Sequence, residues 1–154
     1  MMEGQCACGK IQYRLKQKPM FVHACHCTWC QRETGGPHAI NAMIETSEVE
    51  LLEGELEEVM TPSASGSGQI ICRCPECRVA VWSHYSGMWH KIAFVRVGSL
   101  KDPSSCPPDL HIFTSTMVDW YVLPEGARSV PEFYRRSEYW PPEMIERRAA
   151  ALAD

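Results

Sequence analysis

The chain of 154 residues contains 45% hydrophobic residues and has a formal net charge of -4. This length is typical of a single domain, and the apolar content is enough for a hydrophobic core. A net negative charge argues against binding to nucleic acid or to an anionic membrane surface. No apolar run approaches the roughly 18 residues that a membrane-spanning helix needs. We therefore expect one soluble domain over residues 1–154.

Short strands separated by turn signals dominate the predicted elements, so we expect a mostly β domain with little helix. Alternating or apolar runs predict strands over 10–15, 20–24, 38–44, 69–73, 79–82, 91–97, 111–115 and 118–122. Residues 48–52 and 56–60 are typical of a hairpin around Gly54. Residues 28–34 favour one helical turn, 61–68 an exposed loop and 143–152 a last helix.

Nine cysteines are present, most of them in C-x-C and C-x-x-C clusters. The first residues lack the basic and apolar regions of a signal peptide, so we expect a cytoplasmic protein. In a reducing compartment such clusters favour metal binding. A disulfide framework or a redox dithiol is the alternative.

The densest cluster places Cys25, Cys27 and Cys30 within six residues. Side chains two apart on a strand share a face, so Cys25 and Cys27 are expected to point together while His26 points away, to the surface or to a second shell around the metal. A structural zinc needs four protein ligands, whereas a catalytic zinc keeps one position for water or substrate. The function therefore depends on whether a fourth ligand closes this site; the candidates are His23, His38 and Cys72.

The same spacing recurs in Cys72-x-Cys74-x-x-Cys77, and the pair Cys6-x-Cys8 could complete either triplet. That pair is expected on one strand face, followed by a turn at Gly9. Only 18 residues separate Cys8 from Cys27, as in a zinc ribbon. Local spacing therefore favours pairing Cys6 and Cys8 with the nearer cluster.

Several motifs together resemble the glutathione-dependent formaldehyde-activating (GFA/CENP-V) family over about residues 4–133, which leaves 134–154 as a C-terminal extension. They are Gly4-Gln5-Cys6-Ala7-Cys8-Gly9 with Tyr13, Cys25-His26-Cys27-Thr28-Trp29-Cys30-Gln31-Arg32 with Gly35, Cys74-Pro75-Glu76-Cys77, Gly98-Ser99-Leu100 with Asp102, Pro108 with His111-Ile112, and Trp120. The cysteine clusters carry most of the specificity. The chain departs from the family pattern at Arg78, where glycine is usual, and at the extra Cys72.

The resemblance implies a β-tent (Mss4-like) fold of small antiparallel sheets stapled by zinc, with two zinc ions per chain. It implies a structural zinc held by Cys6, Cys8, Cys74 and Cys77, and a catalytic zinc held by Cys25, Cys27 and Cys30. A long loop between ligands is no obstacle, because closure entropy grows only with the logarithm of loop length. The implied activity is that of a carbon–sulfur lyase that adds a glutathione-like thiol to a small aldehyde such as formaldehyde, or the reverse.

Two other functions remain open from the residues alone. The first is a non-catalytic, zinc-stabilised binding or scaffold domain. The second is a reductase of the methionine sulfoxide reductase type, in which Cys72 or Cys106 would be the nucleophile. His111 is equally compatible with a packed histidine and with a proton shuttle.

Overall fold

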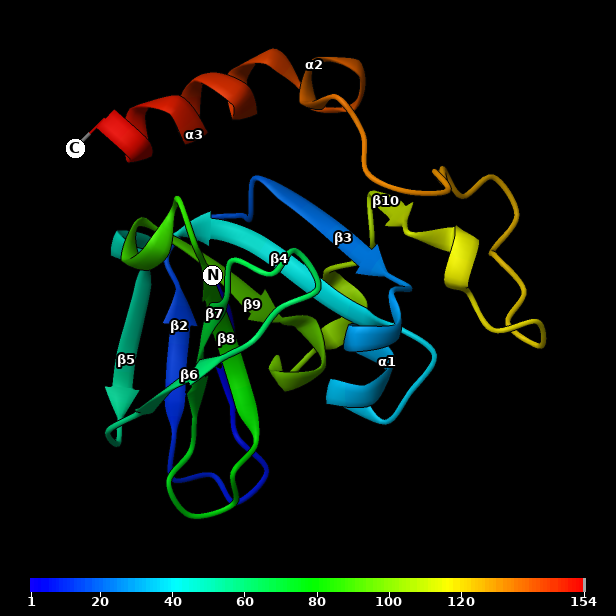
Figure 1. Ribbon diagram of the computed structural model, residues 1–154. Coiled ribbons are helices and arrows are strands. Elements are labelled where there is room, and N and C mark those ends of the chain that lie inside the picture. The colour runs from blue at the N-terminus through cyan, green and yellow to red at the C-terminus, as the bar shows by residue number, and fades with distance from the viewer. Residues whose placement is uncertain (154) are drawn as a thin grey trace.

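Two β-sheets form most of the computed structural model, which describes residues 1–153 (Figure 1). The three-stranded sheet has the order β1 (Met2–Gln5), β2 (Gln12–Leu15), β5 (Val49–Glu53). The seven-stranded sheet has the order β10 (Leu110–Ile112), β3 (Phe21–Cys25), β4 (Ala39–Glu45), β9 (Ile92–Arg96), β8 (Ala80–Tyr85), β7 (Gln69–Arg73), β6 (Glu57–Thr61). β10 runs parallel to β3, and the other paired strands of the described chain are antiparallel. The predicted mostly β class is confirmed, and the arrangement is consistent with a β-tent.

Helices are few and short. The α-helices are α1 (Thr28–Thr34), α2 (Arg136–Tyr139) and α3 (Pro142–Ala153), and the 3-10 turns are Thr46–Glu48, Trp89–Lys91, Val97–Ser99, Pro103–Ser105 and Thr114–Thr116. α2 and α3 follow one another along the side of the larger sheet that carries β3 and β4 (Figure 1). Within residues 1–153, no helix is both long and apolar enough to cross a membrane.

The central strand β4 is buried on both faces, and this divides the core in two. Ala42 and Ile44 belong to the cluster between the two sheets, whereas Met43 belongs to a second cluster against the C-terminal helices. Alternate residues of a strand point to opposite faces, which explains this division. The second cluster also contains Cys25 and Cys30.

Tyr13 fixes the small sheet against the large one. Its ring is fully buried, meets Trp82 edge-on at 5.4 Å, and its hydroxyl lies 2.6 Å from Ser99 Oγ. Gly4 is the cross-strand partner of Tyr13, and a Cβ at that position would overlap the tyrosine ring. The motif residues Gly4, Tyr13 and Ser99 therefore form one packing unit.

Three local predictions were wrong. The strands near 48–52 and 56–60 exist but do not pair as a hairpin, because β5 pairs with β2 and β6 with β7. An isolated two-stranded hairpin is only marginally stable, so each strand is better paired with one that already packs on the core. Cys6 and Cys8 follow β1 in a turn instead of lying on a strand. Residues 118–122 form no strand, because Trp120 and Val122 are 73% and 83% exposed and have no core face to cover.

Candidate metal centres

Four cysteines from distant parts of the chain converge at the first centre. One sulfur each from Cys6, Cys8, Cys74 and Cys77 lies within 4.8 Å of the others. The sulfurs of Cys6 and Cys8 are 3.6 Å apart, and those of Cys8 and Cys74 are 3.7 Å apart. Tetrahedral zinc with Zn–S bonds of about 2.3 Å would hold sulfurs about 3.8 Å apart. The donor set and spacing therefore fit a structural zinc.

Two turns that differ in length by one residue present these ligands. Gly9 N donates to Cys6 O at 3.2 Å in the first, and Arg78 N donates to Cys74 O at 3.0 Å in the second. Both turns end in the left-handed region, at Gly9 (φ 78°) and Arg78 (φ 65°). A side chain in this region costs about 1–2 kcal/mol, a cost that glycine at position 78 would avoid. Local spacing suggested a different pairing, of Cys6 and Cys8 with the Cys25 cluster, and the fold does not adopt it.

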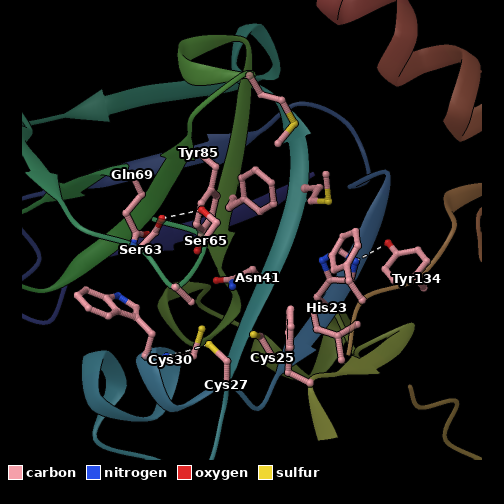
Figure 2. Close-up of a pocket in the computed structure, with 18 of the residues that line it drawn as sticks. His23, Cys25, Cys27, Cys30, Asn41, Ser63, Ser65, Gln69, Tyr85 and Tyr134 are labelled. Carbon is pink, nitrogen blue, oxygen red and sulfur yellow. Dashed lines mark hydrogen bonds between the residues drawn. The ribbon is translucent and has the colours of Figure 1, made fainter. Parts of the chain in front are cut away.

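Three cysteines form the second centre, at the junction of β3 and α1. Cys25 ends β3, Cys27 caps the N-terminus of α1, and Cys30 follows in the first turn. Their sulfurs lie within 4.8 Å of one another and point together (Figure 2). Cys30 N donates to Cys27 Sγ at 3.3 Å, which fixes the cap and the ligand together.

Among residues 1–153, no further His, Cys, Asp or Glu joins this trio. His23, one candidate for the fourth ligand, instead places Nε2 2.5 Å from the hydroxyl of Tyr134. His38 packs against His26 and Tyr121, and Cys72 is buried in β7. Within the described part of the chain, the trio therefore supplies three of the four ligands that a tetrahedral metal site needs.

Negative charge concentrates on Cys27 within the trio. Hydrogen bonds from Cys25 and Cys30 lower the pKa of Cys27 to about 2, and interaction with Cys27 raises the pKa of Cys25 to about 12. Hydrogen bonds with Cys25, which has the larger effect, and with Cys27 raise the pKa of Cys30. Three thiols that share protons in this way are poised to become three thiolates when a dication binds.

A cavity of about 360 Å³ opens directly onto the three sulfurs. Asn41 of β4 lies above them, with Gln69, Ser63 and Ser65 on one side and the His23–Tyr134 pair on the other (Figure 2). Most of the remaining wall is apolar or aromatic, with Met43, Tyr85, Met88, Phe94, Ile112 and Trp140 among the lining residues. The open side of the trio therefore faces a mainly apolar cavity.

Asn41 lines the cavity, and contacts with Arg96 fix the orientation of its side chain. Its Oδ1 accepts a hydrogen bond from Arg96, its cross-strand neighbour on β9, and Arg96 also donates to Ser83 at 2.8 Å. With Oδ1 engaged in this way, the amide N–H groups remain free to bind a ligand oxygen. No sequence pattern indicated Asn41, because its role depends on pairing between β4 and β9.

A cluster formed by His26, His38 and His111 was also not predicted from the sequence. His26 is fully buried, and its Nε2 lies 2.8 Å from His111 Nδ1. Burial lowers the pKa of His26 to about 4 and lowers the pKa values of His38 and His111. His26 points away from the cysteine cavity, as expected. Of the two positions predicted for it, surface or second shell, the surface position is wrong. His111 is packed, and no contact places it on the cavity.

The two remaining cysteines lie apart from both centres. Cys72 and Cys106 are 2% and 4% exposed, and burial raises both pKa values, that of Cys72 to about 12. A thiol with a raised pKa and no access to solvent is a poor nucleophile. The geometry therefore gives no support to a reductase that uses either residue.

The fold and these two centres together define a mostly β domain with cysteine clusters able to hold metal ions. This chain belongs to the glutathione-dependent formaldehyde-activating family: the family's sequence model, described as glutathione-dependent formaldehyde-activating enzyme, matches residues 1–116. A solved structure of a Rhodobacter sphaeroides protein is similar in fold, with 19% sequence identity and a TM-score of 0.50. That similarity covers 68% of this chain and 94% of the other. The search of curated proteins gave no match.

Proposed function

We propose that this protein is a zinc-dependent carbon–sulfur lyase that adds a glutathione-like thiol to a small aldehyde, or catalyses the reverse reaction. Family membership supports glutathione-dependent activation of formaldehyde in general terms. The observation that carries the finer proposal is the trio of Cys25, Cys27 and Cys30, with its open side facing a cavity.

The donor sets of both centres suit zinc, since sulfur-rich tetrahedral sites favour it over harder ions. Cys6, Cys8, Cys74 and Cys77 would hold a structural ion, and Cys25, Cys27 and Cys30 a catalytic one. When bound at the open site, zinc supplies Lewis-acid chemistry that deprotonates a coordinating thiol near neutral pH.

The chain's own groups account for the rest of the reaction. Addition forms a sulfur–carbon bond, converts the carbonyl into a hydroxyl, and moves the thiol proton to that oxygen. The free N–H groups of Asn41 are placed to donate to the oxygen as its charge develops. The apolar side chains around the trio lower the local dielectric, which strengthens these interactions.

The experiment is to measure exchange between free formaldehyde and its glutathione adduct by exchange NMR with the zinc-loaded protein. Faster exchange that disappears with a chelator and returns with zinc is expected. Cys106→Ser is the matched control, because Cys106 is a buried cysteine outside both centres. Activity that needs no thiol, or that is undiminished after metal removal, contradicts the proposal.

A further inference from the structure

The cavity beside the Cys25 trio is much larger than formaldehyde requires. Its volume is about 360 Å³, which is within the range of small-molecule sites. A water molecule occupies about 30 Å³ in the liquid, and formaldehyde has one more heavy atom than water. A one-carbon substrate would leave most of this chamber unfilled.

Part of the wall comes from outside the region that defines the family. The family match ends at residue 116, whereas Phe133, Tyr134, Arg136 and Trp140 all line the cavity. Trp140 stacks on Phe21 of β3 with ring centroids 5.0 Å apart, and Phe133 lies 4.7 Å from Tyr134. These aromatic residues therefore lie C-terminal to the part of the chain that matches the family model.

That wall is anchored to the strand that carries Cys25. Tyr134 contacts His23 at 2.5 Å and accepts a hydrogen bond from Trp140 Nε1 at 2.7 Å. His23 and Cys25 are two residues apart on β3, so they share a face and lie about 7 Å apart. The aromatic wall is therefore held at a fixed distance from the reacting centre.

The lining offers few partners for the charged ends of a peptide thiol. Of the described residues, Arg136 is the only Lys, Arg, Asp or Glu on the cavity wall, and it lies over the Trp140 ring at 5.4 Å. Glutathione carries two carboxylates and an ammonium group, and burying them without partners is unfavourable. The chamber is therefore better suited to an apolar substituent of the carbonyl compound than to the charged part of the thiol.

We propose that the aldehyde substrate of this protein carries an apolar substituent of aromatic size, which occupies the cavity while its carbonyl carbon lies at the Cys25 trio. This inference rests on the proposed function and names its substrate class. In the step, the thiol sulfur bonds to the carbonyl carbon and the thiol proton passes to the carbonyl oxygen. No oxidant or reductant is required.

The kinetic test compares propanal with 3-phenylpropanal, whose reacting carbons are alike and which differ by a remote phenyl ring. Burying that ring is expected to raise kcat/KM at least about tenfold. Phe133→Ala should remove much of this preference, because Phe133 lines the cavity. At 55% exposure it is not needed for the core. Trp120→Ala is the matched control, since Trp120 is an exposed aromatic residue away from the cavity and should leave the preference unchanged.

A binding test without chemistry separates this inference from the proposed function. 3-Phenylpropan-1-ol should bind at least about tenfold more tightly than propan-1-ol in calorimetry, and Phe133→Ala should weaken only the phenyl compound. If formaldehyde and propanal react but the phenyl ring adds nothing, the inference is overturned and the proposed function stands. If no aldehyde reacts, the proposed function fails, and equal binding of the two alcohols overturns the cavity assignment as well.

Discussion

The phenolic oxygen of Tyr134 lies 2.5 Å from Nε2 of His23, a residue 111 positions earlier in the chain. Trp140 Nε1 donates to the same oxygen at 2.7 Å. Burial lowers the pKa of His23 to about 4, so the imidazole is neutral near pH 7. Nε2 of the neutral ring can accept, and the single O–H of Tyr134 is available to donate to it while the oxygen accepts from Trp140. This relay joins the C-terminal segment to β3.

Tyr134→Phe should lower the free energy of unfolding by about 1–3 kcal/mol, because it leaves both His23 and Trp140 without a buried partner. Denaturant unfolding measures the change. Tyr139→Phe is the matched control, because the hydroxyl of Tyr139 makes no hydrogen bond among residues 1–153 and its loss should have little effect. Equal losses in the two variants would show that the relay contributes nothing.

Cys27→Ser should abolish thiol–aldehyde exchange and reduce bound zinc from two ions to one per chain. Cys27 lies between β3 and α1, where it is only partly buried, so most of the fold should persist. Metal analysis and circular dichroism of the purified variant provide the check. Global unfolding would instead place Cys27 in a structural centre.

Cys74→Ser should do the reverse and strongly lower the melting temperature. A structural zinc contributes on the order of 10 kcal/mol of binding energy to folding, and Cys74 is a fully buried member of the four-cysteine centre. The check is to compare the melting temperature of zinc-loaded Cys74→Ser with that of zinc-loaded Cys27→Ser. An unchanged melting temperature for Cys74→Ser would refute the structural assignment.

Acid should destabilise the protein in part through His84, which lies away from both cysteine centres. Burial lowers the pKa of His84 below its usual value of 6.5, and its Nδ1 lies 2.8 Å from Ile92 O. The unfolded chain therefore binds a proton that the folded chain resists. The stability contributed by neutral His84 is present above pH 6.5 and is lost as the pH falls toward the lowered pKa.

Denaturant unfolding between pH 7 and pH 5.5 should show this loss, and His84→Gln should make the slope shallower. The cysteine centres are common to both proteins, so their own acid sensitivity cancels in the comparison. An identical slope in the two proteins would mean that His84 titrates alike in the folded and unfolded states.

Local sequence patterns predicted the helices and strands better than they predicted which strands pair. α1 was expected over 28–34 and spans those residues, because Gly35 (φ 69°) ends it with a left-handed cap. β7 likewise matches 69–73. The partners of β5 and β6 could not be predicted, because both strands are largely exposed and carry little pattern to fix a neighbour.

The spacing of the cysteines alone did not predict how they divide between the two centres. Spacing favoured joining Cys8 to Cys27, whereas the fold brings Cys8 to Cys74, 66 positions away. Only the family resemblance predicted that contact. The aromatic wall from Phe133 to Trp140 had no sequence signal, because its residues meet the cavity only after the C-terminal segment packs on β3.

Anomalous diffraction at the zinc edge from crystals of the zinc-loaded protein tests the central claim most directly. Two peaks per chain are predicted, one within the sulfurs of Cys6, Cys8, Cys74 and Cys77 and one bound by Cys25, Cys27 and Cys30. The fourth ligand of the second ion should be a solvent molecule or an added thiol. A single peak, or a side chain of this chain completing the second site, would contradict the account.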